Sequence, residues 1–402
     1  MMEIQIEEME DHKKNGYYKW QQPEGMNDCI GMGTADLDFR CPSCVKEVCL
    51  RVAEENTYNY RAKPEEYFQT VIGWYKRNYN CRIEKEWLFN VPSTIGAIRV
   101  TLGAMTEPGD AVLVQTPDFA PLTWAIEGAD CKRLENPLRY NDGKYEIDYE
   151  DFEQKIIQYH PKVFLLVNPH NPMGKVFTRE ELERMVEICD RHQVKIISDE
   201  VHSLITYGEH CHLPILAVSE KARKLSVQIV SMSKGFNLMS LPHAIVCIAD
   251  KKLRNQYEKQ VIPYSFHYAT NSFSIAAVTS VMSGQADDWL REVTAYLKQN
   301  VQDTINGFAE ALPQAKVIEP EGGYLIWIDL SAYERPGEGW GKFFLEKTHI
   351  SLNDGAEFGA SYDTFIRINI GLSRQILGEA LERIKNVART IKTVSFLPPC
   401  AT

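Results

Sequence analysis

Short apolar runs rich in β-branched residues alternate with amphipathic segments through the middle of the chain. This alternation is typical of a mostly parallel β-sheet covered by helices, an α/β fold. The apolar runs are strand-sized, far below the roughly 20 residues that a membrane-spanning helix needs, so we expect no membrane span. The strands that the pattern predicts are 111–115, 163–167, 194–198, 227–230 and 244–248.

Helix signals separate two of these strands. Thr178 and Glu181 have the spacing of a capping box, and apolar residues then recur at helical spacing. A helix at this place, between the strands 163–167 and 194–198, makes a βαβ unit. A turn at 107–110 divides an earlier helical pattern from the first of the predicted strands.

The pattern changes near residue 285. A long polar helix, an apolar run, a second helix and a second apolar run follow, at about 287–312, 323–330, 340–347 and 365–370. This order predicts a smaller α+β domain over 286–402, after a large domain over 47–285. Residues 1–46 have no sheet pattern of their own, and we expect them to pack on the smaller domain.

Composition and charge narrow the class of partner. The 402 residues carry 55 acidic and 44 basic side chains, a net charge of −11, and no Lys/Arg block is long enough to follow a phosphate backbone. We therefore expect no nucleic-acid partner. The N-terminus is rich in Glu and lacks the basic start and apolar stretch of a secretory signal, which predicts a cytoplasmic protein.

The ten cysteines are spread along the chain without paired spacing. A chain of this size needs no disulfide framework, so reduced and buried thiols are expected. Cys41, Cys44 and Cys49 come closest to a metal-binding pattern. A single CxxC without a second Cys/His pair is a weak signal, and no metal is expected.

Three polar clusters each follow a predicted strand directly, where open α/β sheets place their ligands. The first, 168–174, holds two Asn-Pro pairs and a Gly, and taken alone it is as well explained as a turn. The second holds Asp199. A buried carboxylate must be paired or hydrogen-bonded, and a helix N-cap is the alternative for this residue.

The third cluster places Lys234 just beyond the strand 227–230, at the rim of the sheet. Burial there lowers the pKa of the amine and makes it a usable nucleophile toward an aldehyde. Ser231 and Ser233 flank the lysine and supply hydroxyl donors for a phosphate. A solvated surface lysine is the alternative.

Taken in order, Asn171, Asp199, Ser231 and Lys234 resemble the cofactor site of fold-type I pyridoxal 5′-phosphate (PLP) enzymes, the aminotransferase superfamily. The resemblance runs from about residue 15 to about residue 390. It implies a large domain with a mostly parallel seven-stranded sheet and a smaller α+β domain. It also implies that Asn171 binds the phenolic oxygen of PLP, that Asp199 pairs with the pyridine nitrogen, and that Lys234 holds the cofactor as a Schiff base.

The same resemblance assigns further cofactor contacts. Ser93, Thr94 and Ile95 precede a predicted helix whose N-terminus would hold the phosphate, although a plain N-cap explains Ser93 as well. Phe119 matches the aromatic residue that stacks on the pyridine ring, with core packing as the alternative. His202 stands where many transaminases have a tyrosine.

Two matches concern the substrate and the assembly. Arg367 matches the arginine that clamps the substrate α-carboxylate, and Ala35 lies in a segment expected to line the substrate pocket. Tyr60 matches a tyrosine that the family contributes to the phosphate site of the other subunit. The resemblance therefore implies a homodimer with shared active sites.

Within the superfamily the chain resembles the carbon–sulfur β-lyase branch, the MalY/PatB or cystathionine β-lyase-like proteins. The segments that carry this resemblance are 35–39, 199–202, 234–238 and 353–359, the last of which runs into 365–369. Many transaminases have an arginine where this chain has Pro242. The chain also departs from the branch, since Phe119 stands where a tyrosine is usual and 93–96 reads Ser-Thr-Ile-Gly.

The resemblance implies an amino-acid substrate and α,β-elimination of a cysteine S-conjugate such as cystathionine, giving pyruvate, ammonia and a thiol. A class I/II aminotransferase is the alternative enzyme. A regulatory or binding protein without turnover is a third reading, since fold does not fix function. The presence of Asn171, Asp199, Lys234 and Arg367 argues against an inactive site.

Overall fold

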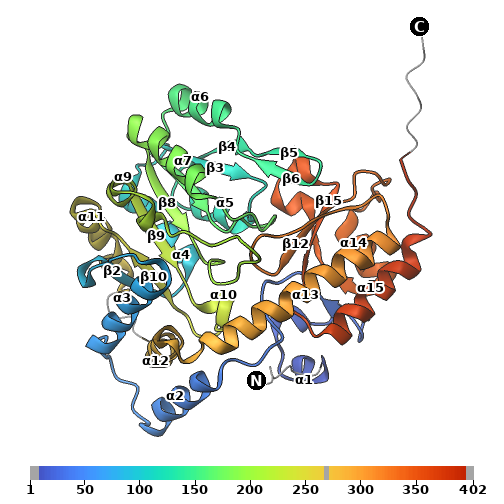
Figure 1. Cartoon of the computed structure of the whole chain (residues 1–402), viewed down its shortest axis with the longest axis horizontal. Helices are drawn as coiled ribbons and strands as arrows, with labels where there is room; N and C mark the ends of the chain where they lie inside the picture. The colour runs from blue at the N-terminus through green and yellow to red at the C-terminus, as the bar shows by residue number, and fades with distance from the viewer. Residues whose placement is uncertain (1–8, 267–270, 395–402) are drawn as a thin grey trace.

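The computed structural model describes residues 9–266 and 271–394 (Figure 1). Its centre is a seven-stranded sheet, as the resemblance implied, in the order β2-β10-β9-β8-β7-β3-β4. The five strands from β9 to β4 are mutually parallel, and β10 is antiparallel to both of its neighbours. The seven strands are Leu88–Val91 (β2), Ala111–Thr116 (β3), Lys132–Pro137 (β4), Val163–Val167 (β7), Lys195–Asp199 (β8), Ser226–Val230 (β9) and Ala244–Cys247 (β10).

Every predicted strand of this sheet is confirmed, to within one or two residues at each end. Successive side chains of a strand point to opposite faces, so a strand buried on both faces is apolar throughout. In β7, Val163 and Leu165 belong to one apolar core, and Phe164 and Leu166 belong to the other. The sheet is therefore the middle layer between two helical layers.

Helices cover both faces of the sheet (Figure 1). One core contains residues of α4, α5 and α11, and the other contains residues of α2, α3, α6, α7, α8 and α9. The predicted capping box of Thr178 and Glu181 is confirmed at the start of α7. These helices are Ser43–Glu54 (α2), Glu65–Tyr79 (α3), Thr94–Met105 (α4), Ala120–Glu127 (α5), Tyr149–Tyr159 (α6), Arg179–Arg191 (α7), Ile215–Val218 (α8), Glu220–Leu225 (α9) and Lys251–Val261 (α11).

A second, antiparallel sheet follows in the C-terminal part, in the order β11-β12-β15-β14. The predicted helices and apolar runs of this part are confirmed, and α13 packs on α15. These elements are Asp287–Ala311 (α13), Lys316–Ile318 (β11), Leu325–Asp329 (β12), Trp340–Thr348 (α14), Asn353–Asp354 (β14), Phe365–Asn369 (β15) and Arg374–Ala388 (α15).

The N-terminal segment reaches across to this C-terminal part. The short strand β1, Ile30–Gly31, pairs in parallel with β13, Ile350–Ser351. Along the chain, the large sheet is followed by α12 and α13, which are separated by a π-helical turn at Val281–Gln285, where Gly284 has a non-helical φ of 101°. The remaining elements are Met9–Lys14 (α1), Arg139–Asn141 (β5), Lys144–Glu146 (β6), Ser233–Phe236 (α10) and Ser272–Ser280 (α12).

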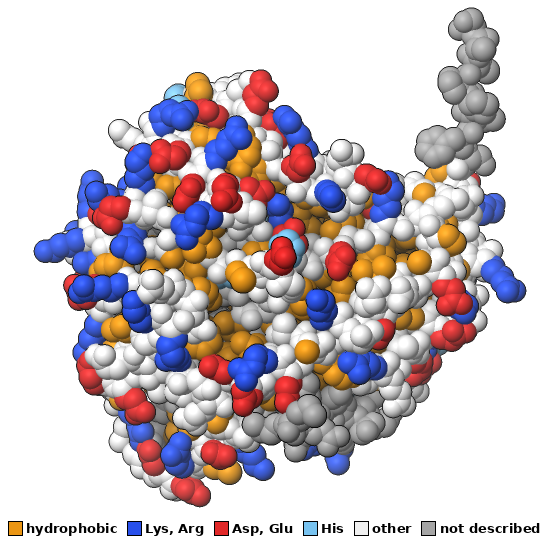
Figure 2. Space-filling view, in the orientation of Figure 1, with side chains coloured by type: hydrophobic (Ala, Val, Ile, Leu, Met, Phe, Trp, Pro, Cys, Tyr) orange, Lys and Arg blue, Asp and Glu red, His pale blue; other side chains and the backbone are white. Residues whose placement is uncertain are grey.

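The surface charge, the helices and the cysteines can be compared with what the composition predicted. Acidic and basic side chains are interspersed over the face drawn in Figure 2. Within the described residues, none of the helices combines the length and the apolar character needed to cross a bilayer. The nine cysteines in the described part of the chain are free thiols, and Cys400 lies outside it.

Candidate active site

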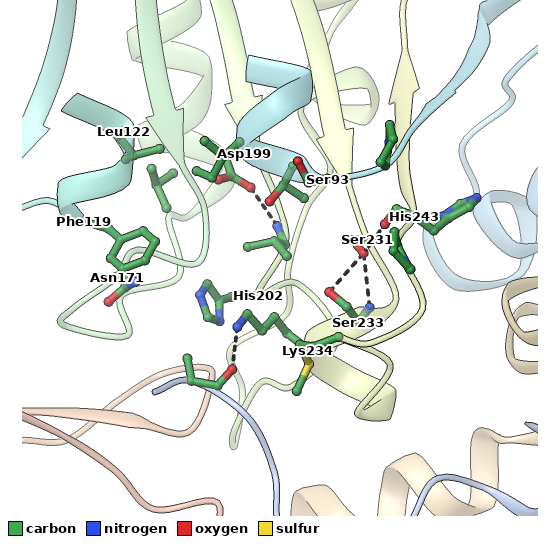
Figure 3. Close-up of a pocket in the computed structure, with 18 of the residues that line it drawn as sticks. Ser93, Phe119, Leu122, Asn171, Asp199, His202, Ser231, Ser233, Lys234 and His243 are labelled. Carbon is green, nitrogen blue, oxygen red and sulfur yellow. Dashed lines mark hydrogen bonds between the residues drawn. The ribbon is translucent and has the colours of Figure 1, made fainter. Parts of the chain in front are cut away.

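A cavity of about 260 Å³ lies at the carboxyl ends of β7, β8 and β9, the edge of the sheet at which the polar clusters were expected (Figure 3). Phe119 and Asn171 lie on one side of it and Ser231 and Ser233 on the other, with Asp199 between them. The predicted residues that line the cavity are Ala35, Ser93, Thr94, Ile95, Phe119, Asn171, Asp199, His202, Ser231, Ser233 and Lys234.

Asp199 is the last residue of β8 and is 5% exposed. Burial raises the pKa of its carboxyl group to about 7, Glu200 adds to this rise, and a hydrogen bond from Val201 N at 3.2 Å opposes it. Residues 201–204 form a turn, so the helix N-cap alternative is wrong. A buried carboxylate that faces a cavity is stabilised by a cation or a donor placed in that cavity.

Glu200, although next in sequence, points away from the cavity and is bonded inside the core. It accepts hydrogen bonds from Ser198 Oγ at 2.8 Å, Ile215 N at 2.9 Å and Gln228 Nε2 at 2.5 Å, and lies 2.8 Å from His212 Nε2. This network satisfies a fully buried carboxylate and holds the end of β8 in place. Asp199 alone is therefore left to face the cavity.

Lys234 lies on the short helix α10, and its Nζ donates a hydrogen bond to the Ala35 carbonyl oxygen (Figure 3). Burial lowers the pKa of the amine to about 8, and the Arg367 cation acts in the same direction. The surface-lysine alternative is therefore wrong. With this pKa about a tenth of Lys234 is the neutral, nucleophilic amine at pH 7, far more than for an ordinary lysine.

Arg367, on β15, is the cation of the site. Its Nη1 donates to Asn171 Oδ1 at 3.1 Å, and its Nη2 donates to Gly33 O at 2.7 Å and to Asn353 Oδ1 at 2.6 Å. The side chain is 3% exposed, and burial lowers its pKa to about 10.

Its hydrogen-bonding partners are neutral oxygens, and its Nε has no partner within residues 9–266 and 271–394. A buried guanidinium in such surroundings is matched to an incoming carboxylate.

The end of the cavity away from Asn171 and Phe119 is built from the start of α4 and from the loop after β9. Ser93 Oγ accepts a hydrogen bond from Gly96 N at 3.0 Å, so the N-cap reading of Ser93 is confirmed. The amides of Thr94 and Ile95 belong to the first turn, whose N–H groups have no carbonyl partner inside a helix. They are suited to bind an anion such as phosphate.

The two serines beside Lys234 have different roles. Ser231 Oγ donates to the His243 carbonyl oxygen at 2.7 Å and accepts from Ser233 N at 3.2 Å (Figure 3). Ser231 therefore ties the lysine loop to the start of β10. Ser233 is only partly buried and lines the cavity, so its hydroxyl is the better placed donor for a bound group.

His202 and Phe119 complete the walls. Burial lowers the pKa of His202 to about 3, with the Lys234 and Arg367 cations acting in the same direction, so its imidazole is neutral. Phe119 packs against both apolar cores, so the packing reading is confirmed, and because it also lines the cavity, stacking on a bound ring stays a prediction. Its ring centroid lies 5.9 Å from the Arg367 guanidinium carbon.

Two predicted site residues, Tyr60 and Arg367, do not line this cavity. Tyr60 lies between α2 and α3 and is 89% exposed. Its expected role concerns the cavity of a second subunit, so it stays a prediction. Arg367 is linked to the cavity through Asn171.

Sequence reasoning missed two residues of the site that carry polar groups. The Tyr324 hydroxyl donates to the Ala35 carbonyl oxygen at 3.2 Å, the oxygen that Lys234 also contacts. His243 lines the cavity, and its Nε2 lies 3.0 Å from the Tyr67 hydroxyl. The only signal for Tyr324 was its place after a Gly-Gly pair at the start of an apolar run.

Comparison with known proteins identifies the class. The model of the family aminotransferase class I and II matches residues 27–384. Because this match covers most of the chain, the chain belongs to that family. The fold is the one that fold-type I PLP-dependent transferases share, with the candidate site at the expected edge of the sheet.

Three proteins similar to this chain are, by name, a cystathionine β-lyase, a cystalysin and a C–S lyase. Cystathionine β-lyase PatB of Bacillus subtilis (strain 168) is 32% identical over 90% of this chain and 93% of its own length. The structure of cystalysin from Treponema denticola, which contains PLP, is 25% identical with a TM-score of 0.90, covering 97% of this chain and 100% of that one. The PLP-bound C–S lyase from Staphylococcus hominis is 26% identical with a TM-score of 0.86, covering 92% and 95%.

Proposed function

We propose that this chain is a PLP-dependent carbon–sulfur β-lyase that cleaves cysteine S-conjugates such as cystathionine to pyruvate, ammonia and a thiol. The observation that carries the proposal is that one cavity receives the Lys234 amine and the Asp199 carboxylate, with Arg367 bonded to its wall through Asn171. The similarity to PatB supports the choice of reaction within the family.

The residues of the cavity fit PLP in charge and in hydrogen bonding. The first-turn amides of α4 suit the phosphate, and the raised pKa of Asp199 marks a buried carboxylate that a protonated ring nitrogen would neutralise. Asn171 suits the phenolic oxygen, and Lys234 supplies the amine for the aldehyde. When bound, PLP supplies an electron sink for bond cleavage at the substrate α-carbon.

The chain's own residues then have separate tasks. Arg367 orients the α-carboxylate, and its contacts with Gly33 and Asn353 keep the guanidinium fixed. The Lys234 amine takes the α-proton as a general base, helped by its lowered pKa. The ammonium so formed lies ready to give its proton to the leaving sulfur, a good leaving group because thiol pKa values lie near 8.5.

An aminotransferase is the second candidate, and the family to which the chain belongs favours it, since that family is named for transamination. Both reactions start with the same proton transfer to Lys234. They differ in where Lys234 would deliver that proton: to the leaving sulfur in elimination, or back to carbon in transamination.

Product analysis separates the two candidates. With cystathionine and other S-substituted cysteines, we expect pyruvate, ammonia and thiol to form at equal rates, faster than any amino-group transfer to 2-oxo acids. Each product is measured in the same sample, with L-alanine as a control that has no leaving group. Steady amino-group transfer without pyruvate release from the cysteine conjugates would establish the aminotransferase instead.

We further propose a homodimer with shared active sites. Tyr60 and Tyr58 are exposed on the segment between α2 and α3, where Tyr58 stacks on Phe273 of α12 with ring centroids 6.1 Å apart. Exposed aromatic side chains of this kind favour burial against a partner, and a two-fold dimer lets each subunit give Tyr60 to the other.

The dimer proposal predicts that Tyr60→Phe weakens PLP binding about tenfold, since one hydrogen bond to a charged phosphate is lost. The affinity is measured by adding PLP to cofactor-free protein, and sedimentation measures the assembly. Tyr159→Phe, at another exposed tyrosine on α6, is the matched control. A monomer with full activity, or an unchanged PLP affinity in Tyr60→Phe, would contradict the shared site.

The domain division and the location stay proposals. We propose domains at 47–285 and 286–402, with residues 1–46 packing on the second, which the β1–β13 pairing and the break at Gly284 support. A cytoplasmic location is supported by the free thiols of the described cysteines, which suit a reducing compartment.

A further inference from the structure

The segment 33–39, which we call the strap, connects the two chemical groups of the site. Ala35 of the strap lines the cavity, and its carbonyl oxygen accepts a hydrogen bond from Lys234 Nζ. The Gly33 carbonyl oxygen accepts a hydrogen bond from Arg367 Nη2 at 2.7 Å. The strap therefore contacts both the reactive amine and the Arg367 guanidinium.

Two asparagines hold the inner side of the strap. Asn369, on the strand that carries the cation, donates through Nδ2 to the carbonyl oxygens of Thr34 and Asp36 at 2.5 and 2.7 Å. Asn237, at the end of α10, donates through Nδ2 to the carbonyl oxygens of Leu37 and Phe39 at 2.8 and 2.7 Å. The strap is thus bonded both to β15 of the second sheet and to the end of α10.

The outer side of the strap is held by a buried cation from the N-terminal segment. The Lys19 side chain is 1% exposed, and its Nζ lies 2.9 Å from Asp36 Oδ1 and 2.8 Å from Asp38 Oδ1. Burial opposes the charged ammonium, but the attraction of the two carboxylates outweighs it, so the pKa of Lys19 is raised. Trp20 Nε1 also donates to Asp38 Oδ1, at 3.0 Å.

The backbone that carries Lys19 is itself fixed. A Cβ atom at Gly31 would lie 1.9 Å from the Lys19 carbonyl oxygen, so this segment packs directly on β1. Because β1 pairs with β13, the ammonium is anchored to the C-terminal part of the chain. A cation so fixed determines where two strap carboxylates can lie.

We propose that Lys19 is a positioning residue for substrate binding: its ion pairs with Asp36 and Asp38 fix the strap, and the strap fixes the Arg367 guanidinium that would receive the substrate α-carboxylate. The proposal rests on the function proposed above. Without Lys19, two neighbouring carboxylates would lie partly or fully buried with their charges uncompensated, and the strap would shift to hydrate them.

The arrangement separates substrate binding from cofactor binding. Apart from Ala35, the described residues that line the cavity come from the large sheet and its connections, and the strap supplies none of the groups assigned to the phosphate or to the ring nitrogen. Loss of Lys19 should therefore weaken binding of the amino acid and leave PLP binding almost unchanged. A general loss of structure would weaken both.

The experiment uses the holoenzyme and L-alanine, which has the α-amino and α-carboxylate groups of the substrate but no leaving group. In Lys19→Met we expect the Kd for L-alanine, measured from the visible absorbance of bound PLP, to rise about tenfold. The Kd for PLP, measured with cofactor-free protein, should change less than about twofold. The double variant K19M/D36N, which leaves one unpaired carboxylate instead of two, should regain part of the lost L-alanine affinity.

Lys385→Met is the matched control, because it removes an ion-paired lysine from an exposed site far along the chain. Equal losses of PLP and L-alanine affinity, no loss at all, or no recovery in the double variant would overturn the proposal. A protein that binds no PLP or gives no spectral response to L-alanine before any substitution would instead refute the proposed function.

A measurement on the unaltered holoenzyme keeps the proposal testable if Lys19→Met does not fold. Hydrogen exchange of the peptides that cover 12–20 and 33–39 should slow together when L-alanine binds, because the Lys19 ion pairs join the two segments. Slower exchange in 33–39 with unchanged exchange in 12–20 would overturn it.

Discussion

Lys234→Ala is expected to abolish the covalent attachment of PLP and to lower turnover by at least about a thousandfold, because it removes both the amine that holds the cofactor and the general base. The unaltered protein should absorb in the visible and retain the cofactor after borohydride reduction. Peptide mapping by mass spectrometry should then place the reduced adduct on Lys234.

The matched control is Lys385→Ala, which removes an exposed lysine paired with Glu310. It should keep the visible absorbance, the reduced adduct and the activity. An adduct on any lysine other than Lys234, or an adduct that persists in Lys234→Ala, would refute the assignment of the site.

Asp199→Asn is expected to lower turnover by roughly a hundredfold or more while the protein stays folded. An amide cannot stabilise a positive ring nitrogen as a carboxylate does, so the bound cofactor withdraws electrons less strongly. Steady-state rates with cystathionine measure the effect. Asp329→Asn is the matched control, since Asp329 is also buried but accepts its hydrogen bonds from the Tyr140 hydroxyl and Ser331 N, outside the cavity.

The same substitution should act in the opposite direction on stability when the cofactor is absent. Burial raises the pKa of Asp199 from 3.8 to about 7, so between these values the folded state binds more protons than the unfolded state. Stability contributed by this group therefore falls as pH rises from about 4 to about 7.

At pH 8 cofactor-free Asp199→Asn should melt at a higher temperature than the unaltered protein, and the difference should shrink toward pH 4. A lower melting temperature at pH 8 together with near-normal turnover would remove Asp199 from its proposed role.

The sequence was informative where each element depends on local patterns. The five inner strands of the large sheet, β3, β7, β8, β9 and β10, are buried and mostly apolar, so the sequence pattern located them. The edge strands β2 and β4 were not predicted, and β4 is largely polar and exposed. The helix α7 was marked by its capping box, in which Thr178 and Glu181 bond to each other's backbone. The motifs after the strands were also visible, because the chain places Asn171, Asp199 and Lys234 each just beyond an apolar run.

Other features depend on contacts between distant segments. Asp199 and Glu200 are adjacent acidic residues, and no local pattern says which of them faces the cavity. The choice is made by the buried network around Glu200, in which His212 and Gln228 are brought together by folding. Likewise, the N-cap alternative for Asp199 was excluded only when the next residues were found in a turn.

By itself, the sequence determined the α/β class, the order of the elements and the identity of the chemical groups, because periodicity, capping and strand ends are properties of short stretches of chain. Tertiary structure alone decided the environments of those groups. The lowered pKa of Lys234 arises from burial and from Arg367, 133 positions later in the chain, and the Lys19 ion pairs arise from the packing of the N-terminal segment on β1. Such interactions depend on distance in space, which residue spacing along the chain does not fix.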